Sequence, residues 1–175
     1  MFLPTQFCQA AWVVPDLDAA MLRWATFTRV GPFFVNRDVK MEQARYRGRP
    51  TDIPVRLAIA QAGGTQIELI EQLDDTPSAY RDSVAMGKEG FHHMAAFVDD
   101  VDAEIARYAA AGAELAYDGY FGDVRIGYVD TRAQMGFMIE LFDHRPGMDA
   151  LFARVAQAAQ DWDGRDPVRD LADLY

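Results

Sequence analysis

The sequence predicts an α+β fold made of two copies of one unit, each a strand, a helix and three further strands. Three observations support this prediction. The 175 residues, half of them hydrophobic, suffice for one ordinary domain or two small ones. A stretch near the N-terminus recurs 84 residues later, and a shorter motif recurs downstream of each copy. Self-similarity of this kind indicates a duplicated structural unit.

The repeat is clearest where residues 9–26, QAAWVVPDLDAAMLRWAT, align with residues 93–110, HMAAFVDDVDAEIARYAA. Downstream, Ile67-Glu68-Leu69 recurs as Ile139-Glu140-Leu141, at an offset of 72. The first copy is therefore 12 residues longer between its two landmarks.

Each copy begins with a short apolar strand, expected near residues 8–14 and 91–98, and continues into a helix. Asp16 and Asp100 precede these helices, where a carboxylate can accept a hydrogen bond from a first-turn N–H. Gly112 is expected to end the second helix, and Gly63-Gly64 to form a hairpin turn. The further strands are expected at residues 33–36, 53–60 and 65–72 of the first copy, and at 114–120, 123–130 and 137–143 of the second.

The rest of the chain connects or follows these two modules. We expect a single domain over residues 1–146, consisting of module 1 (7–72), a linker (73–89) and module 2 (90–143). Residues 147–175 then form a C-terminal helix and a polar tail. The helix is expected at 148–160, because Met148, Leu151, Phe152 and Val155 recur at helical spacing.

Composition excludes several classes of partner. The net charge of −10 would repel nucleic acid and anionic membrane surfaces. The single cysteine, Cys8, permits neither an internal disulfide framework nor a zinc ribbon. Residues Met1 to Val14 lack both a basic leader and a long apolar run. We therefore expect a cytoplasmic protein that binds no nucleic acid and no membrane.

Polar residues occupy matching positions in the two copies. Gln9 and His93 are equivalent, as are Glu68 and Glu140. Because side chains alternate along a strand, Gln9 should lie opposite the face that Trp12 gives to its helix. His93 should lie likewise on the open face, with its neighbour His92 on the other. Glu68 and Glu140 each stand between two aliphatic residues, a costly place for a carboxylate unless it is paired or binds a metal.

These four residues together suit one divalent cation. Two carboxylates balance a charge of 2+, while Gln9 and His93 add neutral donors. Mixed nitrogen and oxygen ligands admit zinc, nickel, cobalt, manganese or ferrous iron. Taken singly, each Glu could instead bond to backbone or arginine, and His93 could be a core histidine. Four such residues at repeat-equivalent positions favour the metal site.

The motifs WVVPDLDAA, QIELIEQ, FHHMAAFVDDVDA and GFMIELFD resemble those of the vicinal oxygen chelate superfamily. That superfamily includes glyoxalase I, methylmalonyl-CoA epimerase, extradiol dioxygenases and bleomycin-resistance proteins. The resemblance covers residues 7–143 and implies paired βαβββ modules in a cupped mixed sheet. It places the metal ligands at Gln9, Glu68, His93 and Glu140. This order is similar to that of one class of glyoxalase I, whereas epimerases typically carry His first and Gln second.

The resemblance implies a divalent-metal-dependent lyase or isomerase of glyoxalase or epimerase type. Such an enzyme removes a proton next to a carbonyl, and its metal stabilises the resulting enediolate. By resemblance Glu140 is the catalytic base and Glu68 returns the proton. The alternatives are a metal-free binding protein of the bleomycin-resistance kind and an accessory member with a vestigial cup, since the amide of Gln9 is a poor ligand. An extradiol dioxygenase is less favoured, because it needs two histidine ligands and only His93 occupies a ligand position.

A basic stretch contains candidate substrate-binding residues. Residues 37–56 have a local charge of +3 and fall within the longer loop of module 1. Arg47, Arg56 and Tyr46 are its candidate substrate-binding residues, for an anionic small molecule or a thioester or thiol conjugate. A solvated loop, or ion pairs across a dimer, explains the same charges equally well. Family resemblance and the extra C-terminal helix lead us to expect a homodimer.

Overall fold

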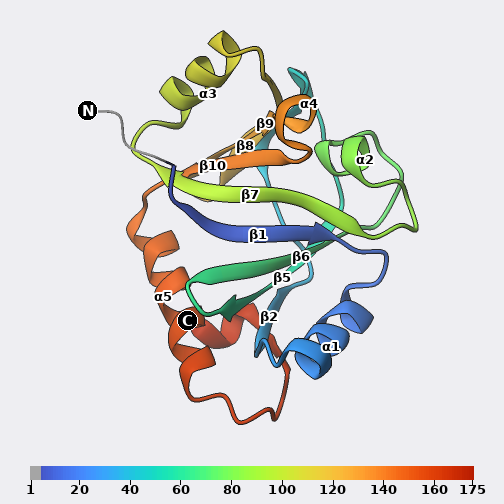
Figure 1. Cartoon of the computed structure of the whole chain (residues 1–175), viewed down its shortest axis with the longest axis vertical. Helices are drawn as coiled ribbons and strands as arrows, with labels where there is room; N and C mark the ends of the chain where they lie inside the picture. Colours follow the sequence, from blue (N-terminus) through green and yellow to red (C-terminus); the bar gives the residue numbers. More distant parts are fainter. Residues whose placement is uncertain (1–4) are drawn as a thin grey trace.

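The computed structural model describes residues 5–175 and contains one strongly curved sheet. Two antiparallel strands form its centre, β1 (Phe7–Val13) and β7 (Gly90–Val98), as Figure 1 shows. Within the described residues the strand order is β11-β2-β5-β6-β1-β7-β10-β9-β8-β3-β4.

The two halves of the sheet repeat one topology. In module 1, β1 pairs in parallel with β6 (Thr65–Gln72), which continues antiparallel to β5 (Val55–Ala62) and then β2 (Phe33–Asn36). In module 2, β7 pairs in parallel with β10 (Met138–Asp143), followed by β9 (Val124–Asp130) and β8 (Glu114–Phe121). The predicted tandem βαβββ fold is therefore confirmed.

The helix of each module covers the convex face of the sheet. In α1 (Leu17–Thr28) the Asp16 carboxylate accepts a hydrogen bond from the Ala19 N–H, and in α3 (Val101–Ala110) Asp100 accepts one from Ala103, both at 2.9 Å. Both predicted caps are confirmed. Because both helices pack their apolar sides on the convex face, the concave face of the sheet stays available for a site. No helix in the described chain is long and apolar enough to span a membrane.

The longer loop expected in module 1 is in fact a pair of short strands. β3 (Glu42–Tyr46) pairs with β4 (Arg49–Pro50) and also with β8 of module 2. The extra residues of module 1 thus extend the far edge of module 2. Sequence reasoning missed this hairpin because Ala44 is the only buried residue of β3, so no hydrophobic alternation marks the strand.

Two short helices were also missed. The expected linker contains α2 (Ala79–Ser83), whose Ala79 and Tyr80 are buried, and α4 (Arg132–Met135) precedes β10. Helices of four or five residues are too short to produce a periodic apolar pattern, which explains why the sequence did not reveal them.

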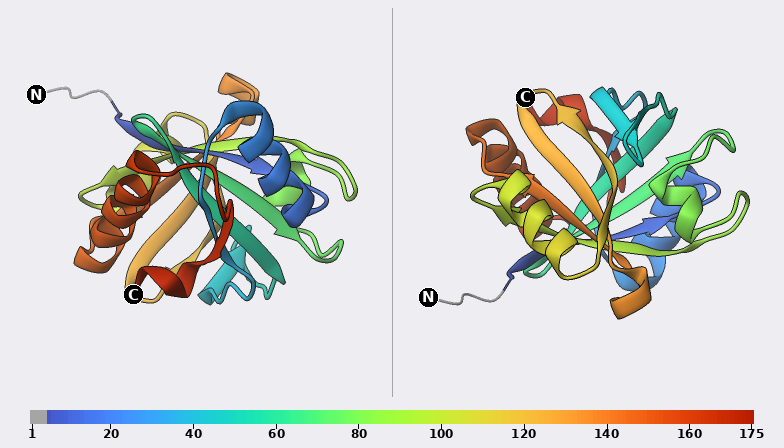
Figure 2. Two further views of the ribbon diagram at one scale, coloured as in Figure 1. Left: turned by 90° about the horizontal axis from the view of Figure 1, so that it is seen from below. Right: turned by 90° about the horizontal axis from the view of Figure 1, so that it is seen from above.

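The C-terminal segment packs against the concave side of module 1. The predicted helix is confirmed as α5 (Pro146–Gln160), whose Leu151 and Val155 pack on Phe34 and Ile59. The polar tail then forms β11 (Val168–Asp170), which pairs in parallel with β2, and the 3-10 helix η1 (Leu171–Leu174). Figure 2 shows the sheet curling, with this segment along one side of the curve.

Candidate metal centre

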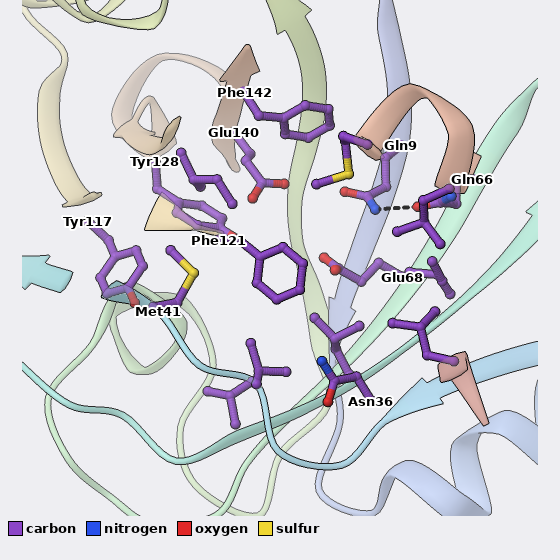
Figure 3. Close-up of a pocket in the computed structure, with 18 of the residues that line it drawn as sticks. Gln9, Asn36, Met41, Gln66, Glu68, Tyr117, Phe121, Tyr128, Glu140 and Phe142 are labelled. Carbon is purple, nitrogen blue, oxygen red and sulfur yellow. Dashed lines mark hydrogen bonds between the residues drawn. The ribbon is translucent and has the colours of Figure 1, made fainter. Parts of the chain in front are cut away.

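The concave face of the sheet contains a cavity, here called the cup, of about 870 Å³ including its open mouth. Gln9 of β1, Glu68 of β6 and Glu140 of β10 all line it, and Figure 3 shows their side chains converging. The repeat explains this convergence. In module 1 Glu68 lies opposite Ala11, two residues after Gln9, and in module 2 Glu140 lies opposite Ala95, two residues after His93.

Glu68, His93 and Glu140 form a compact buried cluster. One ligand atom from each lies within 4.8 Å of the others. The Nε2 atom of His93 is 3.0 Å from an Oε2 of Glu140 and 3.5 Å from that of Glu68. His93 is fully buried, and the two glutamates are nearly so. The structure thus brings together the residues that the sequence placed at equivalent positions.

Three buried atoms at this cluster have no hydrogen-bond partner among residues 5–175: Gln9 Oε1, Glu68 Oε2 and His93 Nε2. Gln9 Nε2 donates to Gln66 Oε1 at 2.7 Å, which leaves the oxygen of the Gln9 amide free. His93 Nε2 is close to Glu140 but makes no hydrogen bond with it, so the contact is not aligned for proton sharing. Unpartnered buried polar atoms are costly. Their donor types are those that a divalent cation accepts, so the residues present fit such a cation.

His92 does not lie on the face of β7 that alternation predicts. Across from β7, Ala11 pairs with His93 while Trp12 pairs with Phe91, so His92 is an extra residue in a β-bulge. The His92 ring lies on the cup side, 5.1 Å from the ring of Tyr80 and 5.8 Å from that of Tyr128. The prediction for His92 was wrong because strict alternation holds only in an unbulged strand.

The bulge links His92 and His93 in a hydrogen-bond chain. His92 Nε2 lies 3.0 Å from the Ala79 carbonyl oxygen, and the Nδ1 atoms of the two histidines are 2.8 Å apart. Burial, and to a lesser degree His93, lowers the pKa of His92 to about 3, so the ring is neutral at pH 7. Since a carbonyl only accepts, His92 donates from Nε2 and accepts at Nδ1. His93 therefore donates from Nδ1 and points the lone pair of Nε2 at the carboxylates.

The electrostatics of the cluster also suit a cation. Burial, followed by repulsion from Glu140, raises the pKa of Glu68 well above its ordinary value. Two adjacent carboxylates in a dry site disfavour each other's ionisation, and a positive ion beside them reverses this effect. The nearby phenols remain neutral at pH 7, because burial raises the pKa of Tyr117 to about 12 and that of Tyr128 well above 10.

The structure does not bring Arg47, Arg56 or Tyr46 to the cup, and none of the three lines it. Arg47 Nη2 lies 2.6 Å from Asp82 and 2.8 Å from Asp130, and the Tyr46 hydroxyl donates to Asp82. Arg56 pairs with Glu71 at 3.4 Å. The contacts of Tyr46 and Arg47 tie the β3–β4 hairpin to α2 and β9, whereas the Arg56–Glu71 pair joins β5 to β6.

Sequence reasoning did not identify several residues at the site. Gln66, which holds the Gln9 amide, lies two positions before Glu68 and therefore on the same face of β6, a signal that was available. No such signal existed for Tyr128 or His92. The sequence likewise contained no signal that four residues of the C-terminal segment, from α5 and η1, would line the cup: Met148, Leu151, Phe152 and Leu171.

Comparison with solved structures finds the same architecture in methylmalonyl-CoA epimerases. The enzyme from Mycobacterium tuberculosis is 20% identical, with a TM-score of 0.54 over 86% of this chain and 97% of that one. A variant of the Streptomyces coelicolor enzyme in complex with 2-nitronate-propionyl-CoA is 22% identical, with a TM-score of 0.59 over 81% and 96%. A further epimerase, in complex with methylmalonyl-CoA and NH4+, is 19% identical with a TM-score of 0.58 over 81% and 96%. At these identities the likeness shows the fold.

No curated protein matches the sequence significantly. The family model described as Glyoxalase/Bleomycin resistance protein/Dioxygenase superfamily, in contrast, matches residues 8–128, which is well over half of the chain. With the tandem modules and the curved sheet that they form, this match shows that the chain belongs to that superfamily, whose fold is the vicinal oxygen chelate fold.

Proposed function

We propose that the protein is a divalent-metal-dependent isomerase or lyase of epimerase or glyoxalase type. It would remove a proton from a carbon next to a carbonyl in a small-molecule substrate. The observation that carries this proposal is the buried cluster with unpartnered Gln9 Oε1, Glu68 Oε2 and His93 Nε2. Similarity to methylmalonyl-CoA epimerases supports the isomerase alternative, and a thioester as one substrate class.

Four residues would hold the cation. Gln9 Oε1 and His93 Nε2 are neutral donors, while Glu68 and Glu140 supply the two negative charges that match a divalent ion. Zinc, nickel, cobalt, manganese and ferrous iron all accept this donor set. A bound cation supplies a Lewis acid that stabilises negative charge on a carbonyl oxygen of the substrate.

The two glutamates would move the proton. Glu140 takes it from the substrate carbon, leaving the electron pair delocalised towards the carbonyl oxygen. Glu68, protonated from solvent at the open mouth of the cup, delivers a proton to the opposite face, and Glu140 then releases its own proton to solvent. Glu68 and Glu140 come from β6 and β10, which flank the central β1–β7 pair on its two sides. Carboxylates that approach the substrate from two sides can remove a proton from one face of the reacting carbon and return one to the opposite face. Their burial excludes water, which would otherwise weaken both as general acid and base.

Solvent exchange tests this proposal directly. In deuterium oxide, the metal-loaded protein should exchange the proton next to the carbonyl of thioesters, hemithioacetals or ketones, measured by NMR. Glu140→Gln should reduce exchange by at least 100-fold, because it removes the base, while Glu71→Gln serves as the control on the same sheet. Glu71 lies outside the cup and pairs with Arg56. Undiminished exchange in Glu140→Gln would refute Glu140 as the base.

A metal-free binding protein is the second candidate. This candidate is favoured by the hydrogen bond from Gln9 Nε2 to Gln66 Oε1, which gives the Gln9 amide nitrogen a partner without any metal. Metal analysis separates the two candidates. If the purified protein contains no divalent metal and takes up none of the added zinc, nickel, cobalt, manganese or iron, the cup only binds a ligand.

A homodimer and a cytoplasmic location complete the proposal. Phe27 and Leu22 of α1 are 82% and 51% exposed, and a second copy would cover them. Burial raises the pKa of the free Cys8 thiol to about 11, so this thiol is protonated and a poor nucleophile at pH 7. Light scattering after gel filtration and cell fractionation test the two expectations.

A further inference from the structure

The wall of the cup that surrounds the acidic cluster consists largely of hydrocarbon. Ile53, Val55, Leu57 and Ile59 line it from module 1, and Phe121, Ile126 and Phe142 line it from module 2. Figure 3 shows Phe121 and Phe142 beside Glu140. Apart from Glu68, Glu140 and the two glutamines Gln9 and Gln66, the polar lining consists of Asn36 and three tyrosines. The tyrosines are neutral at pH 7 because burial raises the pKa of each.

No lysine or arginine among the described residues lines the cup. The basic residues of segment 37–56 that have acidic partners face elsewhere: Arg37 pairs with Asp18, Lys40 with Asp38, Arg47 with Asp82 and Asp130, and Arg56 with Glu71. The two glutamates already match the full charge of a divalent cation. A carboxylate on the substrate would be a third anion in the cup and would therefore lie buried without a counter-charge, which is strongly unfavourable.

The C-terminal segment adds to the apolar wall. Met148, Leu151 and Phe152 of α5 and Leu171 of η1 all face the cavity, so residues outside the two modules help to define its shape. Leu151 is nearly fully buried, and Val155 behind it anchors α5 on Phe34 and Ile59. Methionines such as Met41 and Met148 adapt to apolar ligands of different shapes.

We infer that the part of the substrate held in the cup is uncharged and apolar. The substrate class is a carbonyl compound whose reacting carbon has a hydrocarbon or aromatic substituent, with no carboxylate on that substituent. If the substrate is a thioester, its acyl group enters the cup and its anionic groups stay outside the mouth. This inference rests on the proposed function for the position of the reacting carbonyl. The apolar wall is a separate observation.

Two ligands that differ in one group test the inference. Hexanohydroxamic acid presents two adjacent oxygens to a metal and extends a hydrocarbon tail, and its counterpart has a carboxylate in place of the terminal methyl. Because both ligands share the same metal-binding head group, the ratio of their affinities reports on the tail alone. On metal-loaded protein, calorimetry should show the methyl ligand binding about 100-fold more tightly, because the carboxylate would be buried without a partner. Equal affinity, or tighter binding of the carboxylate, would overturn the inference.

A variant that adds a cation to the wall sharpens the test. Met41 is half-buried and lines the cup, so Met41→Arg places a guanidinium there. This variant should bind the carboxylate ligand more tightly. The ratio of the affinities of the methyl and carboxylate ligands should therefore fall at least 10-fold. Met86→Arg is the matched control, since Met86 is 55% exposed and does not line the cup. If Met41→Arg leaves the ratio of affinities as in the unmodified protein, this wall does not contact the ligand tail and the inference fails.

Failure of the proposed metal site can be told apart from failure of this inference. Metal affinity is measured first, by competition with a chromophoric chelator. If no metal binds, octan-2-one and 7-oxooctanoate are compared on the metal-free protein by displacement of Nile red, a neutral apolar dye. Stronger displacement by the ketone without a carboxylate supports the apolar cup even when the metal proposal has failed. Equal or stronger displacement by 7-oxooctanoate overturns it.

Discussion

The Nδ1 atoms of His92 and His93 lie 2.8 Å apart, although the two residues are neighbours in one strand. A β-bulge makes this contact possible by placing both rings on the cup side of β7. Since His92 also donates to the Ala79 carbonyl, it accepts from His93 and leaves His93 Nε2 free to bind a cation. Hydrogen bonds of this kind commonly orient metal-binding histidines.

Loss of the His92 ring nitrogens should weaken metal binding. His92→Phe removes the acceptor for His93 Nδ1, and we expect metal affinity to fall by about 10- to 100-fold. His92→Gln retains an acceptor and should restore part of the affinity. Competition with a chromophoric chelator measures the effect, with His144→Phe as the control because His144 is an exposed histidine outside the cluster. Equal affinities for the His92→Phe and unmodified proteins would show that His92 does not orient His93.

Replacing Glu68 should stabilise the metal-free protein and abolish its response to metal. Burial and Glu140 raise the pKa of Glu68, so at pH 7 the ionised carboxylate is unfavourable without a cation. We expect Glu68→Gln to raise the metal-free Tm by a few degrees, corresponding to about 1–2 kcal/mol. A saturating divalent metal should then no longer raise the Tm. Calorimetry checks both effects, and a lower metal-free Tm would contradict the proposed repulsion.

A divalent metal should raise the free energy of unfolding of the unmodified protein, by an amount that grows with the ratio of free metal concentration to Kd. At a free metal concentration 100 times the Kd, the gain is about 2.7 kcal/mol, because only the folded chain assembles the four ligands. Scanning calorimetry with and without metal measures this gain, and a chelator should reverse it. The matched control is Glu71→Gln, which should respond like the unmodified protein. If metals leave the Tm of the unmodified protein unchanged, the cluster does not bind them in the folded state.

Acid should destabilise the metal-free protein through His92. The pKa of this histidine falls from 6.5 to about 3 on folding, so between these values the unfolded chain binds more protons. The contribution of neutral His92 is therefore fully present above pH 6.5 and is lost as the pH falls towards 3, a loss on the order of 4 kcal/mol. His92→Gln should have a flatter stability profile over this range, as measured by urea denaturation, whereas His144→Gln should not. Identical slopes for all three proteins would exclude His92 as the cause.

A methyl group added at Gly31, beneath the Trp162 ring, should loosen the C-terminal segment. A Cβ at Gly31 would lie 2.6 Å from Cη2 of the Trp162 ring, whose Nε1 donates to the Arg165 carbonyl. We expect Gly31→Ala to lower stability by about 1–3 kcal/mol and the Tm by several degrees. Gly64→Ala is the control, since no atom of the described chain lies within 4 Å of its added Cβ. A Tm equal to that of the control would mean that Trp162 does not pack on Gly31 in solution.

The sequence by itself determined the repeated unit and the positions of four polar residues in it. The repeat that relates Gln9 to His93 and Glu68 to Glu140 is local in each copy, and alternation along β1 and β6 then fixes the face of each side chain. These are properties of short segments, which is why they could be read without coordinates. The Asp16 and Asp100 caps were predictable for the same reason.

Only the tertiary structure decided the features that depend on distant segments. The β3 hairpin pairs with β8 through backbone hydrogen bonds that require no apolar pattern, and its Arg47 pairs with Asp82 and Asp130 instead of lining the cup. The bulge at His92 arises from the register between β1 and β7, which neither strand encodes alone. The C-terminal segment became a wall of the cup because Leu151 and Val155 found their apolar partners in module 1. Side-chain periodicity encodes which face of an element is buried, whereas the partner of that face is settled by the packing of the whole chain.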